Sequence, residues 1–188
     1  MKQPIKGGGI IKRPKPKKPK KKGWFAYKNT SNQKYGTSKL ERDFAKEFLD
    51  ANGIRYIYQY EAKDIKRFYD FMIVDDDNAY IFEDKDGIHC IRQENQFVDI
   101  QFAIEIDGSY WHSDPRVIGE KKLNSTQRHT KFVDGLKDMW CQEHHIPLLR
   151  IWEYDIRHNP KLVLEQINQY ISVSKSRQKM LSNRKRPH

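Results

Sequence analysis

Residues 102–112 constrain the fold more than any other part of the sequence. Apolar side chains at positions 102, 104 and 106 fall on one face of a period-2 pattern, while Glu105 and Asp107 fall on the other. This alternation is typical of a strand with one buried face and one open face. We therefore expect a half-buried central strand that carries two carboxylates side by side.

The strand ends in a glycine turn that brings further functional groups close to these carboxylates. Gly108 lets the backbone reverse, so that Trp111 and His112 can fold back beside Glu105 and Asp107. Carboxylates gathered near a histidine suit both a hard divalent cation and a general acid or base. The competing interpretation is a solvent-facing strand whose acids have no chemical role.

Helix and strand patterns follow one another along the rest of the chain. Ser38 and Glu41 form a capping box at the start of a helix that ends at Asn52-Gly53. Asn159-Pro160 begins the last helix, which continues through Ile171. The other predicted elements are strands at 54–60, 67–74, 102–107 and 146–152, a helix at 127–144, and a hairpin inserted within 75–101. This order predicts an α/β fold with a mixed sheet flanked by helices.

Positive charge is concentrated at the two ends of the chain. Residues 1–28 contain eleven Lys and Arg and no acid, and residues 172–188 contain six and no acid. The remainder has 19 basic and 25 acidic residues. We expect a flexible basic arm at 1–36, a folded domain at 37–172 and a disordered basic tail at 173–188. Cationic arms on an acidic domain favour a polyanionic partner, most simply DNA, although such arms can also serve solubility alone.

The N-terminal arm combines a run of lysines with aromatic side chains. Trp24, Phe25 and Tyr27 follow the lysines directly and either stack on bases or dock the arm to the domain. The predicted DNA contacts in this arm are Lys15, Lys17, Lys18, Lys20, Lys21 and Lys22.

Cys90 and Cys141 are isolated and have neither zinc-site spacing nor the pattern of a disulfide framework. They favour a reducing compartment. No apolar run approaches the length of a membrane span or the core of a signal peptide. The sequence therefore predicts a cytoplasmic protein with no membrane partner.

Five motifs in order resemble the PD-(D/E)XK nuclease superfamily, and within it the Vsr mismatch-endonuclease branch with its related phage and homing endonucleases. They are Ser38-x-x-Glu41, the strand around Asp70, the 104–112 segment, Asp134-x-x-Lys137-x-x-Trp140, and the segment 146–156. The resemblance spans residues 37–172. It implies a restriction-endonuclease-like sheet, DNA as substrate, catalytic Mg²⁺ that Mn²⁺ can replace, and a phage or mobile-element origin.

The resemblance also implies roles for individual residues. Asp70 and Glu105 would bind the metal together with the backbone carbonyl of Ile106, and Glu41 would reach the site through water. His112 resembles the acid/base histidine of this branch, and Asp134 the acid of the following helix. Trp111 would wedge between DNA bases.

This sequence departs from the family pattern at two places. Asp107 stands where the E-x-K lysine is expected, so a lysine must come from elsewhere; Lys137 is the first candidate and Lys131 the second. Residues 75–101 also separate the two metal acids. Alternative arrangements therefore remain open, in which Glu83 and Lys85 complete the motif with Asp70, or in which Asp99 replaces Asp70.

Two functions follow as expectations. The first is a Mg²⁺-dependent DNA endonuclease of a homing, nicking or DNA-processing type. The second is a nuclease-fold protein without activity that acts as a DNA-binding or virion-associated structural protein, an alternative supported by the missing E-x-K lysine.

Overall fold

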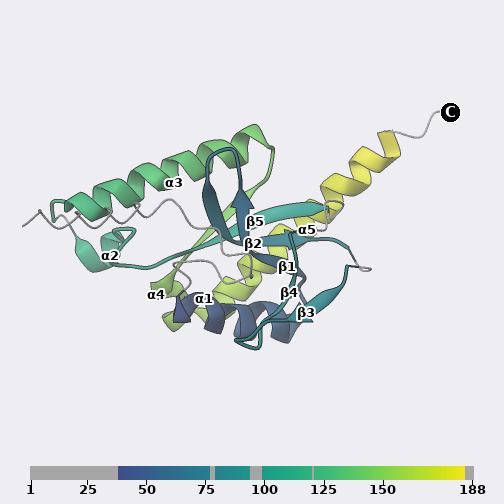
Figure 1. Cartoon of the computed structure of the whole chain (residues 1–188), viewed down its shortest axis with the longest axis horizontal. Coiled ribbons are helices and arrows are strands. Elements are labelled where there is room, and N and C mark those ends of the chain that lie inside the picture. The colour runs from purple at the N-terminus through teal and green to yellow at the C-terminus, as the bar shows by residue number, and fades with distance from the viewer. Residues whose placement is uncertain (1–37, 77–78, 94–98, 120, 185–188) are drawn as a thin grey trace, which may run out of the picture.

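Figure 1 shows the computed structural model of the chain, which describes residues 38–76, 79–93, 99–119 and 121–184. At its centre is a six-stranded mixed sheet with the strand order β3-β4-β1-β2-β5-β6. Helices lie on both sides of this sheet, with α3 on one side and α1 on the other. The predicted α/β class, with a mixed sheet flanked by helices, is confirmed.

The sheet combines antiparallel and parallel pairs. Strand β2 pairs antiparallel with both β1 and β5, whereas β4 pairs parallel with β1 and β6 pairs parallel with β5. The strands are β1 (Tyr56–Ala62), β2 (Arg67–Val74), β3 (Ile81–Glu83), β4 (His89–Ile91), β5 (Ile100–Asp107) and β6 (Leu148–Trp152).

The first helical segment begins and ends where its sequence predicts. Helix α1 (Lys39–Phe44) starts at the N-cap Ser38, whose capping box with Glu41 is fully formed. The helical path continues through a π turn at Ala45–Leu49 and a 3₁₀ turn at Asp50–Asn52. Gly53 then ends it in the left-handed region at φ +64°, which glycine adopts without steric cost.

The remaining helices are α2 (Pro115–Ile118), α3 (Ser125–Glu143), α4 (Glu153–His158) and α5 (Pro160–Arg184). Helix α5 corrects the expectation of a disordered tail from residue 173, because it continues to Arg184. Ser174 is buried, and the Gln178 side chain donates a hydrogen bond of 2.9 Å to Asp99. This part of α5 packs against the domain, a contact that a count of basic residues does not reveal.

Each face of the sheet has its own apolar core. One core joins α1 and the start of α5 to residues such as Phe71, Phe102 and Ile104, and the other joins Trp140 and Cys141 of α3 to the opposite face. Strand β5 is therefore buried on both faces, not on one as its alternation predicted. The open face expected for Glu105 and Asp107 is covered, and both acids are buried.

The hairpin predicted within residues 75–101 is present as β3 and β4, which pair antiparallel at one edge of the sheet. Strand β2 pairs directly with β5 despite this insertion. Glu83 lies on the edge strand and Lys85 in the turn after it, with β4 and β1 between them and β2. The arrangement in which Glu83 and Lys85 join Asp70 is therefore wrong.

The basic arm at 1–36, including its predicted DNA-contacting lysines, lies outside the described residues. Within the described residues, none of the helices combines the length and the apolar character needed to cross a membrane.

Candidate active site

The candidate site lies where β2 and β5 separate. Their last registered pair on this side is Phe71 with Ile104, although β2 begins at Arg67 and β5 continues to Asp107. Beyond that pair, the hydrogen bonds between the two strands are made by side chains instead of by backbone groups alone. We call this part of the sheet, between residues 67–70 and 105–107, the opening. The amide of Asp70 donates to Glu105 Oε1 at 3.3 Å, and the amide of Ile106 donates to Asp70 Oδ2 at 2.7 Å. The opening thus holds two carboxylates from neighbouring strands side by side.

The β1–β2 hairpin bends away from β5 at this opening and packs against α3 (Figure 1). The Tyr69 hydroxyl donates to the Lys137 carbonyl at 2.7 Å, and the rings of Tyr69 and Trp140 lie 5.3 Å apart. The Trp140 indole also donates to Asp64, which lies just beyond β1. These contacts fix α3 over the opening and set the position of its polar side chains.

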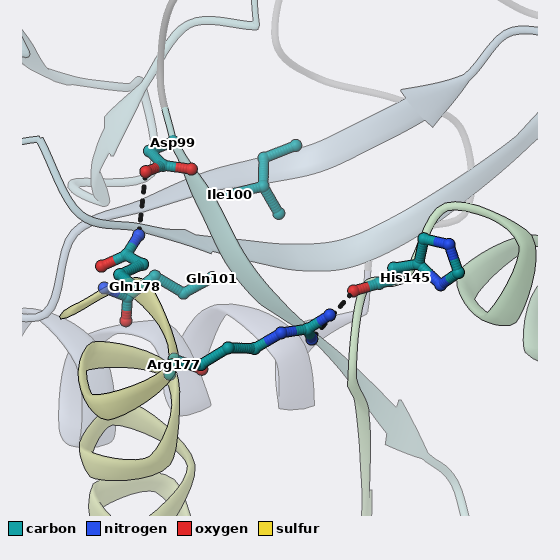
Figure 2. A pocket seen from close by; sticks show the side chains of 7 residues that line it. Asp99, Ile100, Gln101, His145, Arg177 and Gln178 are labelled. Carbon is teal, nitrogen blue, oxygen red and sulfur yellow. Dashed lines mark hydrogen bonds between the residues drawn. The ribbon is translucent and has the colours of Figure 1, made fainter. Parts of the chain in front are cut away.

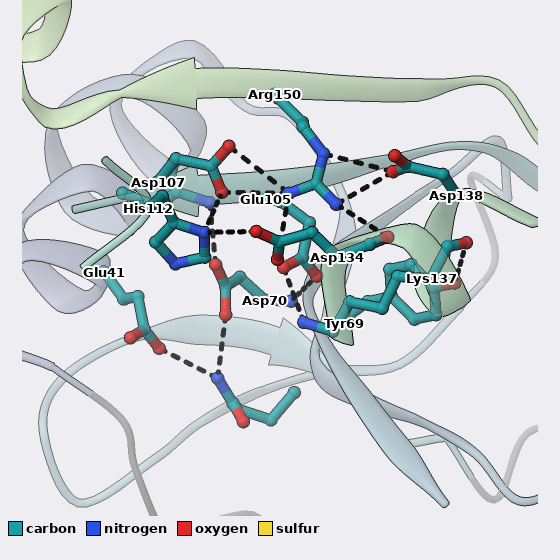
Figure 3. Close-up of polar contacts among 12 residues, drawn as sticks. Glu41, Tyr69, Asp70, Glu105, Asp107, His112, Asp134, Lys137, Asp138 and Arg150 are labelled. Carbon is teal, nitrogen blue, oxygen red and sulfur yellow. Dashed lines mark hydrogen bonds and ion pairs between the residues drawn. The ribbon is translucent and has the colours of Figure 1, made fainter. Parts of the chain in front are cut away.

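Lys137 of α3 reaches into the opening, where its ammonium lies 2.6 Å from Glu105 Oε2 (Figure 3). Its side chain is only 12% exposed. Helical spacing alone would allow Lys137 to pair with Asp134 one turn earlier, but in the structure its partner is Glu105. A lysine therefore lies beside the pair Asp70 and Glu105. It comes from helix α3, and the strand position expected for it is occupied by Asp107.

Glu41 approaches the same opening from α1. Its Oε1 accepts from the Ser38 amide at 2.9 Å within the capping box. Its Oε2 accepts from Gln59 Nε2 at 2.8 Å and from the Tyr58 hydroxyl at 3.3 Å. The capping box and the site thus share one glutamate, and the two explanations for an acid at position 41 are compatible.

Burial and repulsion between charges oppose ionisation of Asp70 and Glu41. Burial, followed by the charges of Glu41 and Glu105, raises the pKa of Asp70 well above its ordinary value. Burial also raises the pKa of Glu41, against the hydrogen bonds from Ser38. Burial alone would lower the pKa of Lys137, but the charges of Glu105 and Asp70 outweigh it and raise that pKa.

These residues fit a divalent cation on the evidence of their charge and their donor atoms. In the described part of the chain, Lys137 is the one cationic group hydrogen-bonded to any of the three carboxylates. Asp70 Oδ1 accepts only a long hydrogen bond, 3.4 Å from Gln59, among those residues. A hard cation would supply the missing positive charge and take such an oxygen as a ligand. Asp70 and Glu105 lie side by side and could provide such ligands, and the resemblance adds the carbonyl of Ile106, the residue whose amide contacts Asp70.

A second polar network lies beside the opening and is centred on His112. Its Nδ1 lies 2.9 Å from Asp134 Oδ2 and 3.3 Å from Asp107 Oδ1 (Figure 3). Burial alone would lower the pKa of His112, but the hydrogen bond to Asp134 and the charge of Asp107 raise it overall. Two acids around Nδ1 favour the tautomer that carries the proton there and leaves Nε2 as the acceptor.

Arg150 of β6 connects this network to the sheet. Its guanidinium lies 3.0 Å from Asp107 Oδ1 and 3.7 Å from Asp134 Oδ1, and it donates to Asp138 at 2.8 Å. Burial raises the pKa of Asp107 to about 6, although Arg150 and His112 oppose that shift. Ligand atoms of Asp107, His112 and Asp134 lie within 4.8 Å of one another. The Arg150 guanidinium lies beside both acids of that trio.

The turn after β5 carries two exposed aromatic residues at the edge of the site. Trp111 is 56% exposed and packs edge-to-face with Tyr110, their ring centroids 5.1 Å apart. The Ser109 amide donates to Glu153 of α4, which holds the turn. A Cβ at Gly108 would lie 3.5 Å from Trp111 Cδ1, an ordinary van der Waals contact, so the turn does not depend on glycine as its sequence suggested. The exposed pair is suited to contact a planar ligand such as a nucleobase.

The structure brings together most of the residues predicted for the site and separates others. Asp70, Glu105, Glu41 and Lys137 meet at the opening, and His112 and Asp134 form the adjoining network. Lys131 is exposed, with no contact to these acids. Asp99 precedes β5 at the far end of that strand and is bonded to Gln178, so it does not replace Asp70.

Two residues of the site were not predicted from the sequence. Gln59 carries one weak signal, since it is the polar residue inside the aromatic strand around Tyr58 and Tyr60. Arg150 lies in the apolar 146–152 strand, where a lone charged residue is costly to bury without partners. Each residue could have been noticed as a polar side chain in an apolar strand. The sequence does not reveal which acids either residue contacts.

A separate cavity of about 160 Å³ lies at the other end of the sheet (Figure 2). Its lining includes Asp99, Gln101, His145, Ser174 and Arg177. Arg177 reaches across it and donates to the His145 carbonyl at 3.4 Å. Because Asp99 and Gln101 are at the start of β5 and Asp107 is at its end, this cavity is not part of the candidate site.

Comparisons with protein-family models, with curated proteins and with solved structures found no match for this chain.

Proposed function

We propose that the protein is a metal-dependent endonuclease that hydrolyses phosphodiester bonds in DNA, with Mg²⁺ as the cofactor and Mn²⁺ as a substitute. The observation that carries the proposal is the convergence of Asp70, Glu105 and Lys137 at the opening between β2 and β5. Hard oxygen ligands beside a buried ammonium are suited to the charge of a phosphate undergoing attack.

The proposed cation site consists of Asp70, Glu105 and the carbonyl of Ile106, with Glu41 behind it. A bound Mg²⁺ would act as a Lewis acid toward the phosphate and lower the pKa of water. Lys137 has a separate task, because its ammonium at Glu105 places a fixed positive charge next to the phosphate oxygens. Such preorganised charge stabilises the transition state without reorganisation.

His112 is the proposed general base. Asp134 Oδ2 lies 2.9 Å from His112 Nδ1 and favours the tautomer with its proton on that nitrogen. Nε2 can then accept the proton of the attacking water. The new bond joins the water oxygen to phosphorus, the bond from phosphorus to the sugar oxygen breaks, and that oxygen is protonated on departure. Arg150 keeps Asp107 and Asp134 in place around the imidazole.

DNA is the proposed substrate because of the basic segments of the sequence and the exposed aromatic pair beside the site. The seventeen basic residues in segments 1–28 and 172–188 are suited to contact the phosphate backbone at many points. The exposed Tyr110–Trp111 pair lies in the same turn as His112. If these rings stacked on DNA bases, a neighbouring phosphate of the same DNA would lie close to His112.

One observation favours a second candidate, a nuclease-fold protein that binds DNA without cutting it. The Ile106 amide occupies Asp70 Oδ2, and Lys137 occupies Glu105 Oε2. If these bonds persist in the presence of Mg²⁺, each carboxylate has only its other oxygen, Asp70 Oδ1 or Glu105 Oε1, to offer to the cation.

A cleavage assay distinguishes the two candidates. Supercoiled, linear, single-stranded and branched DNA would be incubated with the full chain in Mg²⁺, Mn²⁺ or EDTA. Asp70→Ala and Asp134→Ala would be compared with Asp43→Ala, which removes an acid paired with Lys39 on the surface of α1. Cutting that requires metal and is lost only in the first two variants supports the endonuclease. Salt-sensitive binding without cutting would support the second candidate.

A further inference from the structure

Gln59 has an unusual backbone conformation for its place in the sheet. It lies within β1, yet its φ is +53°, in the left-handed region that residues other than glycine and asparagine rarely adopt. The β1–β2 register passes from Tyr58↔Phe71 to Tyr60↔Tyr69 and does not pair the residues between them, Gln59 and Asp70. The bend in the hairpin is thus centred on the residue opposite the proposed metal ligand.

The side chain of Gln59 connects two acids that belong to different elements. It is only 4% exposed, and its Nε2 donates to Glu41 Oε2 at 2.8 Å and to Asp70 Oδ1 at 3.4 Å. The amide nitrogen of Gln59 thus faces both carboxyl groups, which accept its hydrogen bonds. One NH₂ group therefore orients both carboxylates, whose positions are labelled in Figure 3.

We propose that Gln59 is a positioning residue of the metal site. Its left-handed backbone directs its side-chain amide toward Glu41 and Asp70. This inference rests on the proposed function, because it assumes that Asp70 is a metal ligand. By holding Asp70 Oδ1 with a long bond, Gln59 fixes the direction of that oxygen and leaves it available. Hydrogen bonds of this kind from outside the ligand set keep metal-binding side chains in orientation.

A purely structural role is the competing explanation, in which Gln59 only bends the hairpin. The chain offers a matched control for it. Lys66 has the same φ of +53° in the exposed turn between β1 and β2. Replacing either residue with glycine relieves the same backbone strain, but only the change at position 59 removes an amide from the site.

The experiment measures Mn²⁺ binding to the full chain by electron paramagnetic resonance, which detects the free ion, in wild type, Gln59→Met, Gln59→Gly and Lys66→Gly. Thermal melting verifies that each variant is folded. We expect Gln59→Met and Gln59→Gly to weaken Mn²⁺ affinity by about 10-fold or more. We expect wild-type affinity in Lys66→Gly.

The outcomes separate this inference from the function on which it rests. Wild-type affinity in folded Gln59→Gly, with Mn²⁺ bound by the wild type, would overturn the role of Gln59 and leave the metal site intact. The absence of Mn²⁺ binding in the wild type itself would overturn both. The glycine variant also keeps the test valid if methionine is not tolerated at this conformation.

Discussion

The ammonium of Lys137 lies 2.6 Å from Glu105 Oε2, although the two residues are 32 positions apart and lie on different elements. Strand β5 provides the carboxylate and helix α3 provides the ammonium. Asp107, the neighbour of Glu105 on the same face of β5, pairs instead with Arg150 of β6. The buried charges of β5 are therefore paired with cationic side chains from two other elements, α3 and β6.

This arrangement predicts that catalysis depends on one lysine of α3 and not on its neighbour. Lys137→Ala should lower kcat for DNA cleavage by about 100-fold or more, because it removes preorganised positive charge from the transition state. Lys131→Ala is the control, since that side chain is exposed on the same helix. Single-turnover cleavage measures both rates. Equal losses in the two variants would show that α3 contributes only to general DNA attraction.

The second prediction concerns the pH dependence of the proposed base. The pKa of His112 is raised because the hydrogen bond to Asp134 and the charge of Asp107 outweigh burial. Only neutral His112 can accept a proton, so activity should fall as the pH decreases through that raised pKa. Asp134→Asn should move this acidic limb to lower pH and also reduce the maximal rate. A pH–rate profile measures the shift.

The control for that profile is Glu143→Gln, which changes an exposed acid at the end of the same helix. Its acidic limb should coincide with that of the wild type. An unshifted limb in Asp134→Asn would assign the titration to another group.

The third prediction links metal binding to proton release. Because burial and the charges of Glu41 and Glu105 raise the pKa of Asp70, a proton competes with a cation for this carboxylate at higher pH than it would for an ordinary aspartate. A cation binds the ionised form, so Mn²⁺ affinity should increase with pH and binding should release a proton. Calorimetry at several pH values, in buffers with different ionisation enthalpies, measures both quantities. Affinity that does not change between about pH 6 and pH 8 would contradict the assignment of Asp70.

The fourth prediction tests the aromatic pair beside the site. Trp111→Ala should weaken DNA binding by about 10-fold, the usual effect of losing one stacked base contact, without lowering thermal stability. Val173→Ala is a matched control, because this α5 side chain is 61% exposed. Fluorescence anisotropy with labelled DNA compares them. Unchanged affinity in Trp111→Ala would exclude the wedge.

The fifth prediction concerns the arm. Deleting residues 1–28 removes eleven basic residues and no acid. The slope of log affinity against log salt should become less steep, because fewer counterions are released when DNA binds. Titrations at several salt concentrations give the slope. The same slope in the shortened chain would mean that the arm does not contact DNA.

Local signals in the sequence account for much of the fold. The capping box at Ser38 and the pair Asn52-Gly53 mark the limits of the first helical segment because caps act on neighbouring residues. Strand β2 has the predicted limits, since its run of apolar and aromatic residues is long and unbroken. Lys137 could be named as a candidate because helical spacing places it one turn after Asp134.

Other features depend on contacts between distant parts of the chain. The alternation in β5 suggests an open face, but α3 covers that face. The contact of Arg150 with Asp107 follows from the parallel pairing of β5 with β6, which no local pattern reveals. The positive φ of Gln59 depends on the bend of the hairpin toward α3. Helix α5 continues to Arg184 because Ser174 and Gln178 meet the start of β5.

The position of a bound metal tests the central claim most directly. Crystals of the full chain grown with Mn²⁺ would give an anomalous difference map that locates the ion. We expect a peak in contact with Asp70 and Glu105, at the opening between β2 and β5. A peak instead among Asp107, His112 and Asp134, where Arg150 now lies, would contradict it, as would the absence of any peak at saturating Mn²⁺.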